Sequence, residues 1–106
     1  MDDVAIVGVG QSTFYRRESG MSIRELCYDA FKESMQGLDL TNKDIDASIT
    51  CSAPEYDKQR TPSGLVSEYL ELTPKPTFVV ESQCSSSTSG LRVAYALIKS
   101  GLHKVV

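Results

Sequence analysis

The sequence predicts an α/β fold in which helices alternate with the strands of a mostly parallel sheet. Short apolar runs rich in β-branched residues alternate along the chain with longer segments whose apolar residues recur at helical spacing. The expected order is β-α-β-α-β-α-β, and each helix is long enough to connect two parallel strands by a right-handed crossover. At 106 residues the chain is one small domain or a portion of a larger one.

The first predicted strand covers residues 4–7, and the first predicted helix begins after Ser22. The four apolar residues of the strand show no alternation with polar residues, which is typical of a parallel strand covered on both faces. Ser22 is followed three residues later by Glu25, the spacing of a capping box. Apolar residues then recur every three or four positions as far as Leu38, so one face of this helix is apolar.

Two further strands and a second helix are predicted in the middle of the chain. A weaker strand covers residues 47–51, and a stronger one covers Thr77–Val80. Between them, Thr61 followed by Pro62 is typical of an N-cap and the first position of a helix.

A third helix, over residues 91–98, is predicted to be buried because it is apolar almost all round. Arg92 is its only charged residue, Gly101 suits the position after its end, and residues 102–106 predict a fourth strand. A helix buried on all sides needs more protein around it than these residues provide. We therefore expect residues 1–106 to be the N-terminal part of a larger α/β protein, cut at its fourth strand.

Composition excludes several classes of function. The chain carries 11 Lys and Arg against 14 Asp and Glu, a net charge of −3, which argues against a bulk nucleic-acid binder and a polybasic membrane-surface segment. No apolar run approaches the roughly 20 residues of a membrane span, and no signal-peptide pattern is visible. Three cysteines without CxxC spacing and one histidine disfavour a disulfide scaffold or a metal site and suit the reducing cytoplasm.

The glycines after the first predicted strand raise the question of a dinucleotide-binding loop. Gly8 and Gly10 would need a third glycine at position 13, which is Thr13. The following helix also begins too late for its N-terminus to reach a pyrophosphate held at Gly10. A plain turn is the favoured interpretation.

Most of the remaining polar or reactive residues favour structural interpretations. Cys27 falls on the apolar stripe of the first helix, and Cys51 ends a strand, so a packing role is favoured for both. His103 lies nineteen residues after Cys84 with a helix between them, roughly 25–28 Å away, and cannot activate it within one chain. The loop carboxylates, interpreted as solvated charges, are Asp44, Asp46, Glu55 and Asp57.

Cys84 is the candidate nucleophile. It follows a predicted strand and stands at the start of the third helix, where unpaired N–H groups and the helix dipole favour thiolate over thiol. The small residues at 85–89 would let a substrate approach. On this local pattern a nucleophile and a buried cysteine among capping hydroxyls both remain open.

Residues 84–101, CSSSTSGLRVAYALIKSG, resemble the nucleophile region of the thiolase superfamily, in particular the archaeal and sterol-carrier-like acetyl-CoA acetyltransferases. The nucleophilic cysteine, the small-residue helix start, the Ala-rich helix and the terminal glycine agree in order and spacing. The resemblance covers nearly the whole chain, including residues 4–10, 22–37 and 44–47. One departure is Ser87, where the family usually has glycine, and its side chain would narrow the acyl pocket.

The resemblance implies ping-pong acyl transfer from coenzyme A thioesters, with Cys84 as the acyl-accepting nucleophile and its backbone N–H as oxyanion donor. No metal and no tightly bound cofactor are implied. The family's catalytic histidines, its second cysteine and most of its coenzyme A-binding loop would lie beyond residue 106, so we expect the chain alone to be inactive.

The same resemblance implies a homo-oligomer with a contact near Thr77–Val80, or a larger enzyme assembly. Two alternatives stay open. Within the fold, a hydroxymethylglutaryl-CoA or ketoacyl synthase would use the same cysteine with different partner residues. From another class, the chain would be a non-catalytic acyl-CoA or lipid-binding subunit.

Overall fold

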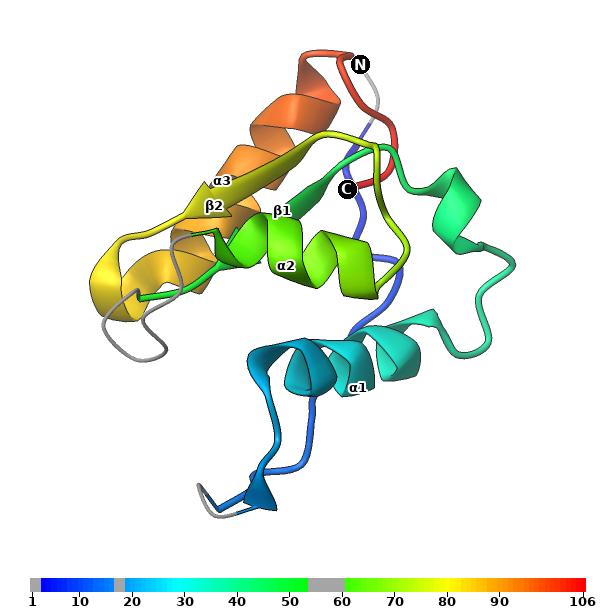
Figure 1. The fold of residues 1–106 in the computed structure, drawn as a ribbon. Coiled ribbons are helices and arrows are strands. Elements are labelled where there is room, and N and C mark those ends of the chain that lie inside the picture. The colour runs from blue at the N-terminus through cyan, green and yellow to red at the C-terminus, as the bar shows by residue number, and fades with distance from the viewer. Residues whose placement is uncertain (1–2, 17–18, 54–60) are drawn as a thin grey trace.

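The computed structural model describes residues 3–16, 19–53 and 61–106. The elements of these residues alternate between helix and strand (Figure 1). In chain order they are α1 (Ile23–Met35), the 3-10 turn η2 (Asn42–Asp44), β1 (Ser48–Cys51), α2 (Pro62–Tyr69), β2 (Thr77–Val80), the 3-10 turn η4 (Gln83–Ser85) and α3 (Ser86–Lys99). The predicted α/β class is confirmed.

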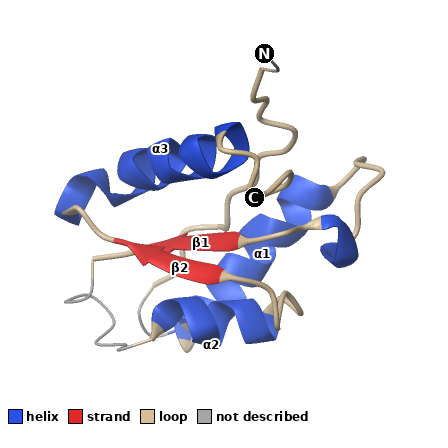
Figure 2. Ribbon diagram, turned by 90° about the horizontal axis from the view of Figure 1, so that it is seen from above, coloured by secondary structure: helices blue, strands red, loops and turns tan. Residues whose placement is uncertain are grey.

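The elements form three layers around a small parallel sheet. Figure 2 shows α3 on one face of the two strands and α2 on the other, and α1 packs against α2. β1 and β2 pair in parallel from Ser48 opposite Thr77 to Cys51 opposite Val80. The helix α2 forms the crossover between these strands, as the sequence predicted.

A triangle of hydroxyl groups holds the two strands and α2 in register. The Ser48 hydroxyl lies 2.9 Å from the Ser67 hydroxyl and donates to the Thr77 hydroxyl at 3.0 Å, while the Ser67 and Thr77 oxygens are 2.8 Å apart. Ser67 is 1% exposed. A shift of the strand register would leave this buried hydroxyl without its partners, at a cost of about 1–3 kcal/mol.

The helix α1 begins and packs as its sequence predicts. The Glu25 N–H donates to the Ser22 hydroxyl at 3.3 Å, and the Ser22 N–H donates to the Glu25 carboxylate at 3.2 Å, which completes the capping box. The apolar stripe of α1 then packs against the core. The core residues are Ile45, Val66, Leu70 and Leu72, and the α1 residues against them are Cys27, Phe31 and Met35.

Residues 4–7 do not form the predicted strand. No backbone hydrogen bond joins them to another described segment, and a strand requires such a neighbour. The segment instead passes close to α1. A Cβ at Gly8 would overlap the Ser34 carbonyl oxygen, and one at Gly10 would overlap the Ala30 carbonyl oxygen. These glycines therefore allow a close backbone approach rather than a dinucleotide loop.

Residues 102–106 also differ from the predicted fourth strand, since their hydrogen bonds to the segment before β1 involve Asp46 alone and form no ladder. The Asp46 N–H donates to the Val105 carbonyl at 2.8 Å. The Asp46 carboxylate accepts from the N–H groups of Lys104 at 2.7 Å and Val105 at 3.0 Å. These hydrogen bonds to backbone N–H groups lower the pKa of Asp46 from its ordinary value.

The third helix, expected to be buried only with more protein around it than these residues provide, is partly exposed in the described residues. Ser86 and Gly90 are buried against the sheet, whereas Leu91 is 62% exposed and Tyr95 is also exposed. The sheet covers α3 on one side only (Figure 2). The apolar composition therefore predicts the helix correctly, but burial depends on what packs against each face.

The Asp46 contact predicts an acid-sensitive attachment of residues 102–106. Because the folded-state pKa is lowered, the stabilisation is present above the unfolded-state pKa and is lost as the pH falls through the folded-state value. We expect Asp46→Asn to lower the urea midpoint at neutral pH and to reduce the further loss at acid pH. Asp39→Asn, an exposed control, should follow the unsubstituted chain. If the urea midpoints of the Asp46→Asn and unsubstituted chains fell by the same amount as the pH was lowered, the role assigned to Asp46 would be wrong.

Candidate active site

The turn between β2 and α3 positions Cys84 at the surface. β2 ends at Val80, and Cys84 is the middle residue of η4, directly before α3 begins at Ser86. Its thiol is exposed, whereas those of Cys27 and Cys51 are half-buried. In Figure 1 this turn is the yellow-orange end of the sheet beside the start of α3. The position predicted for the candidate nucleophile, between a strand and a helix, is the position observed.

The backbone of the turn adopts an unusual conformation immediately before Cys84. Gln83 has φ 54°, in the left-handed region that favours glycine, and its N–H donates to the Glu81 carboxylate at 2.7 Å. The Ser85 N–H donates to the Ser82 carbonyl at 3.1 Å. None of the hydrogen bonds among the described residues of this turn uses the N–H of Cys84. That N–H is therefore available to a ligand.

Four serine hydroxyls stabilise the turn. The Ser86 hydroxyl accepts from the Ser82 N–H at 2.9 Å and donates to the Gln83 carbonyl at 2.8 Å. The Ser85 hydroxyl donates to the Ser82 carbonyl, and the Ser89 hydroxyl donates to the Ser82 hydroxyl, both at 2.9 Å. These side chains cap the turn, which is the role that sequence reasoning kept as the alternative.

Ser87 and Thr88 differ from the other hydroxyl-bearing residues. Both are exposed, and neither side chain makes a hydrogen bond within the part of the chain that the structure describes. They lie in the first turn of α3, directly after the turn that carries Cys84. The exposed Cys84 and the exposed hydroxyls of Ser87 and Thr88 are therefore neighbours in the sequence at this end of α3. A thiol there has the chemistry to attack a carbonyl group, and the hydroxyls have the chemistry to bind one.

Cys51 has a packing role in the structure. It ends β1 against α3, where a Cβ on Gly90 would overlap its Sγ atom. Burial raises the pKa of the Cys51 thiol from its ordinary value, which disfavours the thiolate. Cys27 packs against the core from α1. Both cysteines therefore have the structural positions that their sequence context predicted.

The other predicted polar residues lie apart from Cys84. His103 follows the far end of α3, whose length is about 20 Å, so the only histidine is not near the thiol. Asp44 accepts from the Thr41 N–H at 2.7 Å and caps η2, and Asp46 binds the backbone of residues 104–105. Glu55 and Asp57 lie outside the described residues.

Two further kinds of feature are absent from the part of the chain that the structure describes. No group of three or more His, Cys, Asp or Glu side chains within that part could hold a metal ion. No helix within it is long and apolar enough to cross a membrane. Sequence reasoning missed the left-handed Gln83 and its link to Glu81. No local signal marks that conformation, because glutamine is not a residue that favours it.

Comparisons with known proteins give consistent matches. The acetyl-CoA acetyltransferase of Methanothermobacter thermautotrophicus is 32% identical over the whole chain, which spans 28% of that protein. The enzyme of the same name from Methanocaldococcus jannaschii is 33% identical over the whole chain, which spans 27% of it. The chain thus spans little more than a quarter of these curated relatives. No family model matches it.

The fold matches a solved structure as well. The 3-oxoacyl-[acyl-carrier-protein] synthase III of Aquifex aeolicus aligns with a TM-score of 0.66 and 24% identity. The alignment covers 80% of this chain and 28% of that one. At this identity the match concerns the fold alone. With sequence matches to two acetyl-CoA acetyltransferases over the whole of this chain, and with this shared fold, the chain belongs to the thiolase superfamily.

Proposed function

We propose that residues 1–106 form the N-terminal part of a thiolase-type acyltransferase whose acyl-accepting nucleophile is Cys84. The observation that carries this proposal is the exposed Cys84 thiol on the β2–α3 turn, with its own N–H uncommitted. The matches to acetyl-CoA acetyltransferases, which cover the whole of this chain, support the reaction class. In this proposal coenzyme A thioesters are the substrates, and no tightly bound cofactor takes part.

The first half-reaction follows from the geometry of the turn. The Cys84 sulfur attacks the thioester carbonyl carbon, and the carbonyl oxygen becomes an oxyanion to which the Cys84 N–H would donate. When the carbon–sulfur bond to coenzyme A breaks, the acyl group remains on Cys84 and coenzyme A leaves as a thiol after taking a proton. Ser87 and Thr88 would lie beside the acyl group, where Ser87 narrows the space available to it.

The second half-reaction requires groups that the described residues do not place near Cys84. A second acetyl-CoA must lose a proton from its methyl carbon before it attacks the acyl-enzyme, which needs a general base. His103 lies at the far end of α3. We infer that this acid–base pair is supplied by the further length that the relatives possess.

We also propose that the outer edge of β2 contributes to a subunit contact. Among the described residues β2 pairs with β1 only, so its other edge offers unpaired backbone groups. Phe78 and Val79 are 38% and 41% exposed on this strand. An edge with exposed apolar side chains is suited to a second copy of the enzyme.

A related condensing enzyme is the alternative function, favoured by the beta-ketoacyl-[acyl-carrier-protein] synthase III of Rickettsia massiliae, which is 28% identical over 76% of this chain. It would keep Cys84 as the nucleophile and differ in the acyl acceptor. The two proposals therefore predict the same acyl-enzyme, and the nature of the second substrate distinguishes them.

The test is acylation without turnover. Incubation of the 106-residue chain with acetyl-CoA should add the mass of one acetyl group at Cys84, while thiolysis of acetoacetyl-CoA should stay at background because the chain's only histidine, His103, lies at the far end of α3. Peptide mapping by mass spectrometry locates the adduct, and the Cys84→Ala chain is the control. Steady thiolysis by the chain alone would contradict our inference that the acid–base pair is supplied by the further length that the relatives possess. Coenzyme A binding without any adduct would instead support a non-catalytic subunit.

A further inference from the structure

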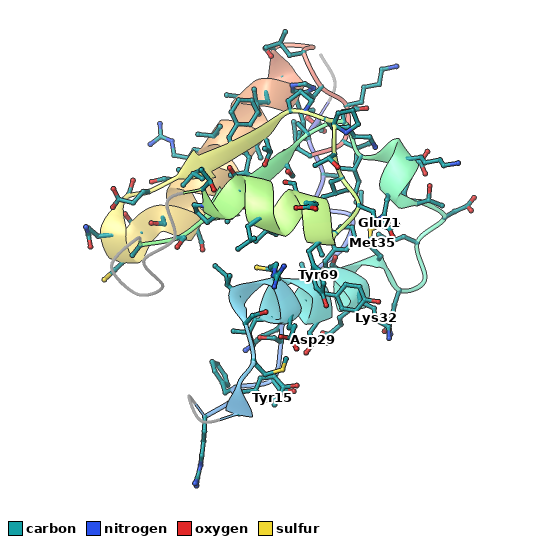
Figure 3. The ribbon with its side chains drawn as sticks, viewed as in Figure 1. Tyr15, Asp29, Lys32, Met35, Tyr69 and Glu71 are labelled. Atoms are coloured by element: carbon teal, nitrogen blue, oxygen red, sulfur yellow. The ribbon has the colours of Figure 1, made fainter. Side chains whose placement is uncertain are left out.

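A pocket lies between α1, the loop before η2 and the end of α2. It is separate from the turn that carries Cys84. Its volume is about 490 Å³, within the range of small-molecule sites. Apart from Asn42, its buried and half-buried lining is apolar and consists of Phe31, Met35, Leu40 and Leu70. The exposed residues that line it include the cation Lys32 and the carboxylate Glu71. Figure 3 shows Glu71 and Lys32 on either side of Met35 and Tyr69.

The walls of this pocket are held by contacts within the chain. The rings of Tyr28 and Tyr69 meet edge to face with centroids 5.9 Å apart, and the Arg24 guanidinium lies 5.5 Å from the Tyr69 ring. Across the pocket, the Asn42 side-chain amide donates to the Leu70 carbonyl and ties the loop to the end of α2. The site is therefore formed before any ligand arrives.

Glu71 stands where folding preferences disfavour a glutamate. The Leu72 N–H donates to the Ser67 carbonyl at 2.8 Å, and the Glu71 N–H donates to the Glu68 carbonyl at 3.1 Å. These two bonds form a Schellman motif, whose left-handed residue is usually glycine. Here that residue is Glu71, with φ 60°. Its carboxylate also lies at the negative end of the α2 dipole, so it is unfavourable in a second way.

A residue that opposes both preferences, and that lines a pocket opposite a cation, points to a role other than folding. We propose that this pocket binds a free α-amino acid with an apolar side chain. The Glu71 carboxylate accepts hydrogen bonds from the ammonium group, Lys32 donates to the carboxylate, and the apolar lining takes the side chain. The proposal does not depend on the role of Cys84.

Ligand-observed saturation-transfer NMR tests this site, and it works for associated as well as monomeric protein. The 106-residue chain should give saturation transfer to L-leucine and L-phenylalanine at millimolar concentration. 4-Methylpentanoate, which lacks the ammonium group, and isopentylamine, which lacks the carboxylate, should each bind at least about tenfold more weakly than leucine. Equal binding of leucine and both analogues would show an unspecific apolar cavity and overturn the proposal, as would the absence of binding.

Substitutions locate the site. Glu71→Gln and Lys32→Gln should each weaken binding of leucine by at least about tenfold. Glu68→Gln and Lys43→Gln are matched controls, because these exposed residues do not line the pocket, and they should leave binding unchanged.

Glu71→Gly separates binding from stability. Glycine relieves the left-handed backbone and removes the unfavourable charge, so the thermal midpoint should rise while leucine binding is lost. If Glu71 had a structural role alone, the thermal midpoint would change while leucine binding stayed as in the unsubstituted chain. Retention of binding in both Glu71→Gln and Glu71→Gly would overturn the proposal.

Discussion

Cys84→Ala is expected to abolish acyl-enzyme formation in the complete enzyme and to lower the overall rate at least about 10³-fold, roughly 4 kcal/mol of transition-state stabilisation. The substitution removes the proposed nucleophile and leaves the turn intact, since the bonds that shape it come from serines 82, 85, 86 and 89 and from Glu81. Cys84→Ser should be almost as slow, because an alcohol has a far higher pKa than a thiol and His103 lies at the far end of α3. Burst-phase release of coenzyme A measures the step.

Chemical labelling gives an independent measurement of the same assignment. Iodoacetamide at neutral pH should modify the exposed Cys84 much faster than the half-buried Cys27 and Cys51, and acyl-CoA should protect it. Cys27→Ala and Cys51→Ala serve as matched controls that retain the fast site. If Cys84→Ala keeps most of the activity, or if Cys51 is the residue labelled and protected, the nucleophile assignment is wrong.

Gly90→Ala is expected to destabilise the chain by about 1–3 kcal/mol, the usual effect of overpacking. The added methyl group would overlap the Cys51 Sγ atom, which α3 contacts through the bare backbone of Gly90. Removing that sulfur should restore the space, because the Cβ of Cys51 is 3.8 Å from the added carbon, an ordinary contact. The Cys51→Ala and Gly90→Ala double variant should therefore be more stable than Gly90→Ala alone.

Urea unfolding of the four chains in this cycle measures the coupling between the two positions. Gly64→Ala is the matched control: it also places alanine in a helix, but the new Cβ has nothing within 4 Å. That control should be stabilised by roughly 0.5–1 kcal/mol through backbone entropy. Additive effects of the Cys51 and Gly90 substitutions would show that the predicted overlap does not limit the packing of α3.

Several elements were predictable from the sequence because their causes are local. The capping box at Ser22 and Glu25 begins α1, and Pro62 occupies the first position of α2. The strand Thr77–Val80 is observed with its predicted bounds. The position of Cys84 between a strand and a helix was also predictable, since it depends only on the order of two adjacent elements.

Other features were decided by tertiary structure because they depend on partners distant in the chain. Residues 4–7 have the composition of a strand, but a strand forms only where backbone groups find a neighbour, and α1 offers them none. The close approach of Gly8 and Gly10 to the backbone of α1 is likewise a contact between segments that are distant in the sequence. Apolar composition likewise predicted α3 but not which of its faces is covered.

The same division holds for the candidate site. The sequence by itself determined the α/β class, three helices, two strands and Cys84 as the reactive cysteine to examine, because spacing and capping act within a few residues. Only the tertiary structure decided which hydroxyls cap the turn and which remain beside the thiol, that Cys51 packs against Gly90, and that His103 is remote. Each of these depends on distances in space, which the order of residues does not specify until the chain is packed.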